Sequence, residues 1–213
     1  SIVADGVSTS TVTSGVIRDV YGNSVENGTL ITVATDRGTI TTADASGAYA
    51  GIQVATVNGV ISFTVQSSTT VGTANVTAAS VQGSASGSTQ ITFIPGPPAG
   101  TITLTPSPSS IVANGTTTST VTSGVITDAY GNTVSNGTLI TVATSLGTIT
   151  TADADIVTAG IQVATVSGVI SFTVRSGTVA GTANVTAASV QGSASGSTQI
   201  TFIPGPPAGT ITL

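Results

Sequence analysis

The stretch Ile-Gln-Val-Ala-Thr-Val-Ser-Gly-Val-Ile-Ser-Phe-Thr-Val-Arg at residues 161–175 decides the fold of this chain. After Ser167-Gly168, apolar and polar residues alternate, so that Ile170, Phe172 and Val174 fall on one face. Alternation with a period of two is typical of a strand with one buried face. A Ser-Gly pair between two such runs indicates a two-residue hairpin turn. We therefore predict strands over 161–166 and 169–175, joined by a tight turn.

Short apolar runs of the same kind continue on both sides of this hairpin, and clusters of Asn, Asp and Gly separate them. Ile102 and Leu104 mark a short opening strand that the prolines at 106 and 108 should break. Val121 and Val125 are expected to share a buried face. No segment shows helical periodicity, which predicts an all-β fold, a two-sheet antiparallel sandwich. The predicted strands cover residues 101–105, 111–113, 118–128, 139–144, 148–151, 161–166, 169–175, 182–190 and 194–203.

The chain carries this pattern twice. Residues 1–104 and 110–213 align without a gap at an offset of 109, and 86 of 104 aligned residues match. A fixed long period indicates tandem copies of one domain. The predicted core consists of alternating strand residues that recur in both copies, namely Ile61, Phe63, Val65, Val76, Ile91 and Phe93 in the first and Ile170, Phe172, Val174, Val185, Ile200 and Phe202 in the second.

The repeat also predicts the domain boundaries. We expect a first sandwich at 1–94, a Pro/Gly linker at 95–100, a second sandwich at 101–203, and at 204–213 a linker with the opening strand of a following repeat. The opening residues 101–104 recur at 210–213 and have no counterpart before Ser1. The first sandwich should therefore have an unpaired sheet edge. A Thr-Ile-Thr-Leu strand would fit there, from a neighbouring chain in a filament or from residues before Ser1 in a longer array.

Composition excludes several classes of function. The chain has no Cys, His, Met or Trp, only three basic residues against eight acidic ones, and 5% charged residues. The net charge of −5 argues against nucleic-acid binding. No apolar run approaches the length of a membrane span. Without His, Cys or Lys, the chain lacks the usual bases and nucleophiles, so we expect no enzyme, no catalytic residues and no cofactor.

Four short motifs occur in the same order in each copy. In the first they are Ala4-Asp5-Gly6, the turn at 19–25 that begins at Asp19, Gly38-Thr39, and Gly-Thr-Ala-Asn-Val-Thr-Ala at 72–78. The ordered set resembles the bacterial Ig-like domains of the invasin and intimin adhesins. The resemblance implies two tandem Ig-like β-sandwich domains in an elongated array. It also implies that most such domains act as stalk modules, with receptor binding in a tip.

Several polar and aromatic residues are candidates for sites. Asp19 and Asp128 open Asp-x-x-Gly-Asn turns, where the carboxylate either accepts backbone N–H groups or binds calcium, and we favour the turn. Asp153 and Asp155 are weak calcium candidates, because calcium takes six to eight oxygen ligands and these two supply only part of a set. Tyr21 and Tyr130 are expected to pack at sandwich corners.

The expected function is structural: a tandem-repeat segment of a secreted or surface-anchored bacterial protein, acting as an adhesin stalk. The alternative is a subunit of a self-assembling extracellular filament or sheath joined by strand donation, which the scarcity of Lys and Glu at sheet edges favours. A carbohydrate-binding module is a third interpretation, although the chain has no Trp to stack on sugars. Expected partners are neighbouring repeats or copies of the chain itself, with any host or surface receptor contacted only through regions outside this sequence.

Overall fold

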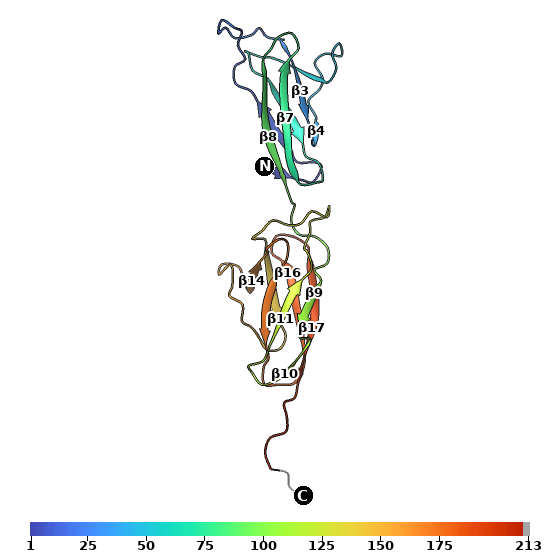
Figure 1. The fold of residues 1–213 in the computed structure, drawn as a ribbon, viewed down its shortest axis with the longest axis vertical. Helices are drawn as coiled ribbons and strands as arrows, with labels where there is room; N and C mark the ends of the chain where they lie inside the picture. Colours follow the sequence, from blue (N-terminus) through green and yellow to red (C-terminus); the bar gives the residue numbers. More distant parts are fainter. Residues whose placement is uncertain (211–213) are drawn as a thin grey trace. The chain divides into compact units, whose positions relative to one another are not determined.

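The computed structural model describes residues 1–210 and divides them into two compact units, a first at Ser1–Gly96 and a second that begins at Pro97 (Figure 1). The described residues contain strands and turns and no helix. Ile211, Thr212 and Leu213 lie outside the described residues, and with them lies most of the opening strand predicted at 210–213. The all-β fold class predicted from the sequence is confirmed.

The first unit is a sandwich of a five-stranded and a three-stranded sheet. The larger has the order β1-β8-β7-β3-β5 and the smaller the order β2-β6-β4. β1 pairs in parallel with β8, and the other pairings are antiparallel. The strands are β1 (Ile2–Val3), β2 (Thr9–Thr13), β3 (Leu30–Thr35), β4 (Thr39–Ile40), β5 (Ile52–Ala55), β6 (Ser62–Gln66), β7 (Gly72–Ser80) and β8 (Ser86–Ile94).

The second unit repeats this architecture with one additional strand. Its larger sheet has the order β10-β17-β16-β12-β14, and its smaller sheet the order β13-β15-β11-β9. The additional strand, β9, lies at the edge beside β11. The strands are β9 (Leu104–Ser107), β10 (Ser110–Val112), β11 (Thr118–Ser123), β12 (Leu139–Thr144), β13 (Thr148–Ile149), β14 (Ile161–Ala164), β15 (Ser171–Arg175), β16 (Gly181–Ser189) and β17 (Ser195–Ile203).

Alternation along the strands builds a separate core in each unit. In β15, Phe172 and Val174 point inward and are at most 1% exposed, and the Thr and Ser residues beside them lie nearer solvent. All twelve residues predicted to form the two cores are buried. The predicted hairpin is also present, because Val166 pairs with Val169 across Ser167 and Gly168, which both have positive φ. Positive φ at both turn residues matches the twist of the flanking strands.

Three local predictions are wrong. Val125 is 59% exposed, because β11 ends at Ser123 and the alternation of that strand no longer applies to it. Pro106 lies inside β9 rather than ending it, paired opposite Val121, since an edge strand tolerates a residue without an N–H. Tyr21 and Tyr130 are 87% and 53% exposed and do not pack in the corners, and neither side chain belongs to a core cluster.

Candidate functional site

Residues 97–107, here called the completing segment, close one side of the second unit. At the start of the segment, backbone carbonyl groups accept hydrogen bonds from β17 and from the residues just before it. Ser193 N and Ala194 N donate to Pro98 O, and Ser195 N donates to Gly100 O. Ile102 N then donates to Ser195 O at 2.8 Å. Further along, the segment becomes β9 and pairs with β11 of the smaller sheet. The completing segment therefore joins the two sheets of the second unit, including residues 97–100 that the sequence assigned to a spacer.

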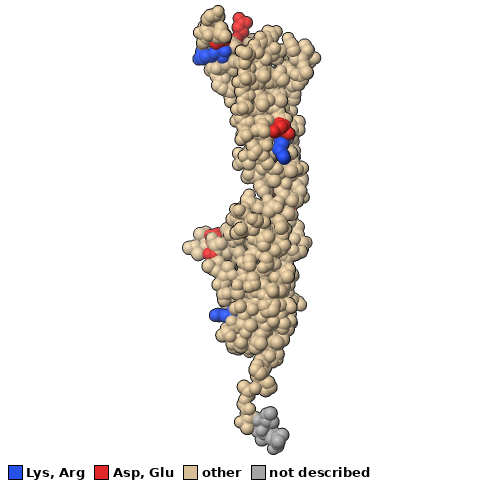
Figure 2. Space-filling view, viewed as in Figure 1, with Lys and Arg blue, Asp and Glu red and all other residues tan. Residues whose placement is uncertain are grey.

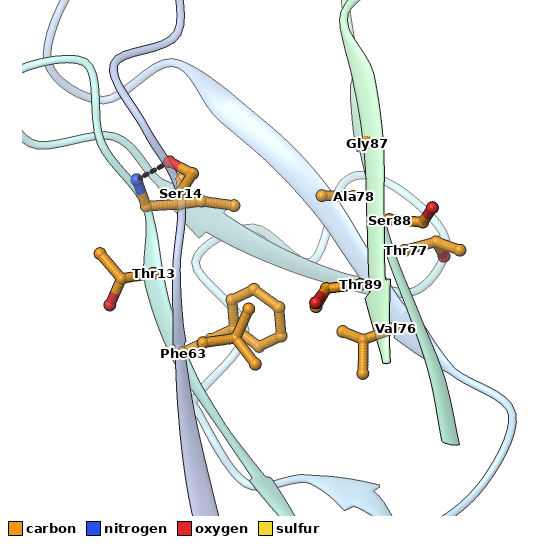
Figure 3. Close-up of a pocket in the computed structure, with 11 residues that line it drawn as sticks. Thr13, Ser14, Phe63, Val76, Thr77, Ala78, Gly87, Ser88 and Thr89 are labelled. Atoms are coloured by element: carbon orange, nitrogen blue, oxygen red, sulfur yellow. Dashed lines mark hydrogen bonds between the residues drawn. The ribbon is translucent and has the colours of Figure 1, made fainter. Parts of the chain in front are cut away.

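The same place in the first unit is an open groove. It consists of two adjoining hollows of ≈ 210 and ≈ 250 Å³ that share Ser14, Ile61, Ala78 and Gly87. In Figure 3, Thr13 and Ser14 lie on one side of the first hollow and Ser88 and Thr89 on the other, with the ring of Phe63 between them. The groove thus lies between β2 of the smaller sheet and β8 of the larger one.

Identical residues in the two units show what the completing segment covers. Ala194 is 2% exposed in the second unit, whereas its counterpart Ala85 is exposed. Val121 is 0% exposed, whereas Val12 is half-buried. The same difference separates three further pairs, Ile126 from Ile17, Val134 from Val25 and Ala187 from Ala78. Because these residues match in sequence, the difference in burial comes from the environment of each copy.

Two glycines of the second unit lie directly against the backbone of the completing segment. A Cβ at Gly196 would overlap the carbonyl oxygen of Ile102, and one at Gly192 would overlap that of Pro98. Their counterparts are Gly87 and Gly83. A Cβ at Gly87 has nothing within 4 Å, and one at Gly83 meets only Ser80 of its own turn. The first unit therefore carries the glycines that admit a neighbouring backbone, without a backbone beside them in the described residues.

In the two Asp-x-x-Gly-Asn turns, the aspartate carboxylate accepts hydrogen bonds from backbone N–H groups of the turn. Asp128 Oδ1 accepts hydrogen bonds from Tyr130 N and Asn132 N, both at 2.9 Å, and Asp128 Oδ2 accepts one from Asn132 Nδ2. Asp19 makes the same bonds in the first unit, and the hydrogen bond from the Asn23 side chain is the largest cause that lowers the pKa of Asp19. This arrangement is the Asx turn that the sequence favours over a calcium ligand.

Asp153 and Asp155 lie two positions apart in one loop, and the carboxylates of both accept hydrogen bonds from neighbouring residues. Asp153 Oδ1 accepts from Asp155 N and from Gln162 N, and Asp155 Oδ2 accepts from Thr158 Oγ1 at 2.6 Å. The bond from Thr158 is the largest cause that lowers the pKa of Asp155. Within residues 1–210, no three His, Cys, Asp or Glu side chains gather where they would hold a metal ion.

Charge does not mark a site elsewhere on the surface. Figure 2 shows charged side chains at a few separate places on the face drawn, with large uncharged areas between them. Among the described residues no helix is long and apolar enough to cross a membrane. The groove is therefore the most distinctive site in the described part of the chain. The repeat offset predicts an unpaired edge, but only the folded structure shows which residues surround it.

Comparisons with known proteins identify a shared fold. No protein-family model and no curated protein matches the chain. The structure of InvD from Yersinia pseudotuberculosis matches it with a TM-score of 0.57 and 23% identity, over 100% of this chain and 57% of InvD. The Y. pseudotuberculosis adhesin InvE matches with a TM-score of 0.44, 19% identity and coverage of 94% and 56%. Invasin, a bacterial integrin-binding protein, matches with a TM-score of 0.45, 21% identity and coverage of 94% and 40%.

The chain spans little more than half of the InvD structure, and the identity is low, so the likeness concerns the fold. That fold agrees with the motif resemblance seen in the sequence. The two units therefore share the all-β sandwich fold of the InvD structure.

Proposed function

We propose that this chain is a structural segment of a bacterial cell-surface adhesin, in which Ig-like units repeat in tandem to form a stalk. The observation that carries the proposal is the near-identical repetition of one Ig-like unit, with 86 of 104 aligned residues unchanged. Repetition of one unit adds length and stiffness, whereas two copies of one site are seldom needed for catalysis. Contact with a host or surface receptor would belong to other parts of a longer protein.

The construction of each unit supports a mechanical role. Each has its own core cluster, so that each folds around its own apolar side chains. The outward positions of the strands carry mostly Thr, Ser and Asn, which suit an exposed pleated surface without charge. Low charge also allows neighbouring repeats to approach without electrostatic repulsion.

Antibodies against the chain test the location. On intact, unpermeabilised cells of the source bacterium they should label the surface, because an adhesin stalk lies outside the cell envelope. Labelling that appears only after permeabilisation would contradict the proposal.

Force spectroscopy tests the mechanical role. Stretching the chain from its two ends should give two separate unfolding events, each releasing roughly 300 Å of chain, as about 95 residues extend to ~3.3–3.6 Å each. A single event that releases the whole length would show that the two units do not act as independent modules.

A second candidate function, a subunit of an extracellular filament, is favoured by one specific observation. The first unit presents the open groove that the completing segment fills in the second unit.

A further inference from the structure

We propose that the open groove of the first unit binds residues 206–213 of a second copy of this chain, so that copies join head to tail. Residues 206–213 read Pro-Pro-Ala-Gly-Thr-Ile-Thr-Leu, the same sequence as residues 97–104. In the second unit this sequence forms all but the last three residues, 105–107, of the completing segment, which fills the groove equivalent to the one that is open in the first. The inference concerns an interface between chains and does not depend on the stalk role.

The acceptor side offers the same backbone groups as the occupied groove. In the second unit, Ser195 N donates to Gly100 O, Ile102 N donates to Ser195 O, and Gly124 N donates to Thr103 O at 3.0 Å. The counterparts of Ser195 and Gly124 are Ser86 and Gly15, which both line the open groove. In addition, β2 is the edge strand of its sheet, whereas its counterpart β11 pairs with β9. The donor would reach this edge with Leu213, the counterpart of Leu104, which pairs with Ser123 at the start of β9, so that Leu213 would pair with Ser14.

The open groove also offers an apolar position for one side chain of the donor. Ile102 is 2% exposed and belongs to the same buried core cluster of the second unit as Ala187 and Ala194. The counterparts Ala78 and Ala85 line the open groove and are more exposed. Ile211 has the same place in the donor sequence as Ile102 has in the completing segment. Burial of this one side chain would supply much of the apolar gain on binding.

The donor is available on a second copy. Its described part, residues 206–210, is exposed and belongs to no strand. Neither the donor nor the residues that line the groove carry a charged side chain. Exposed backbone, a repeated sequence and a neutral groove fit another copy of the chain better than a charged partner.

This interface would not close on itself. Within these 213 residues the open groove and the donor sequence belong to different units, so a contact between them would be heterologous and would build open chains of copies rather than two-fold dimers. Because the interface is neutral, 1 M salt should not weaken it, since salt screens only charge–charge attraction.

Sedimentation velocity of the 213-residue chain over increasing concentration tests the proposal. We expect masses that rise beyond the dimer with concentration. Gly87→Val should reduce the assembly to monomers, because a side chain at the equivalent Gly196 would overlap the entering backbone. The matched control is Gly47→Val, in a loop outside the groove where a Cβ meets nothing within 4 Å and the second unit carries Ile156. The control should assemble as the unchanged chain does.

A mixing experiment separates donor from acceptor. Ile211→Asp should also remain monomeric, because it places a charge where the second unit buries Ile102. Mixed in equal amounts, Gly87→Val supplies a donor and Ile211→Asp supplies a groove, so that the mixture should form heterodimers and nothing larger. Oligomers that persist in either single variant would overturn the proposal.

A peptide with the sequence of residues 97–107 measures the groove without relying on assembly. It should bind the chain, and its Ile→Asp version should bind roughly 10- to 100-fold more weakly, as expected for the loss of one buried aliphatic side chain. Binding of the peptide to a chain that stays monomeric at every concentration would overturn the second copy as the occupant and assign the groove to another segment. No peptide binding and no assembly would overturn the groove itself.

Discussion

Replacing Ile102 by Ala tests whether the completing segment is an integral part of the second unit. Ile102 is 2% exposed and belongs to the core cluster of that unit, although it lies close to the predicted spacer. If the segment were only a linker, the substitution would have the small effect of a surface change. If the segment completes the sandwich, the substitution removes packed core atoms.

The magnitude follows from the atoms removed. The change deletes three buried carbon groups at about 0.8 kcal/mol each, which gives about 2.4 kcal/mol before any cavity cost. The segment lies at the margin of the core, where neighbours can collapse into the space, so we expect a total of about 2–3 kcal/mol, at the lower end of Ile→Ala substitutions. For a unit of this size, that corresponds to a drop in Tm of roughly 10–20 °C.

Differential scanning calorimetry of the whole chain measures this drop. Hydrogen exchange measured on peptides shows which of the two units has lost stability. Peptides from β6 and β15 can be told apart by mass, because β15 ends in Arg175 where β6 ends in Gln66. The matched control Thr101→Ala alters an exposed neighbour and should stay within about 0.5 kcal/mol. An effect of Ile102→Ala as small as that of the control would refute the reasoning, as would a shift in the first unit's transition.

Three further predictions use other parts of the chain. Phe172→Ala should destabilise the second unit by about 3–5 kcal/mol in urea denaturation, because the ring is 1% exposed, and a loss below about 1 kcal/mol would contradict the core assignment. Hydrogen bonds led by that from the Ser8 side chain hold the pKa of Asp5 well below its usual range, so its contribution to stability is present above about pH 4 and is lost as the pH falls further. Asp5→Asn should therefore reduce the loss of first-unit stability below pH 4, as followed by circular dichroism in an acid titration. The variant should still form the turn, because Asn114 makes the same turn in the second unit. An unchanged acid profile would contradict this prediction. Millimolar calcium should leave the Tm of the second unit unchanged, because Asp153 and Asp155 supply only two carboxylates, and a rise in Tm that Asp155→Asn abolishes would contradict the assignment.

Much of the fold was predictable because its determinants are local. The hairpin at Ser167-Gly168 follows from two turn residues that accept positive φ, and the burial of Phe172 follows from alternation inside one strand. Predictions failed where a strand ended early or lay at an edge. Val125 lies beyond the end of β11, and Pro106 is tolerated because β9 has a free side.

The groove depends on a segment far from it in sequence, and this limits what local patterns show. Val12 and Val121 have the same neighbours along the chain, yet only Val121 is fully buried, because residues 97–107 cover it. The offset of the repeat predicts that one copy lacks its cover. It does not predict that Ala85, Gly87 and Ser14 surround the space, since these residues come together only after both sheets form.

The identity of the hairpins β7–β8 and β16–β17 has a consequence for how the chain folds. Both have the same sequence, so β3 of the first unit can pair with β16 as well as with its own partner β7. Chain connectivity alone distinguishes the two pairings, because the wrong one closes a loop about three times longer. Loop-closure entropy favours the correct partner by only about 1 kcal/mol for such a ratio. Correct pairing therefore depends on the order in which the strands become available, and we expect fewer exchanged strands when the first unit folds during synthesis than when the whole chain refolds from denaturant.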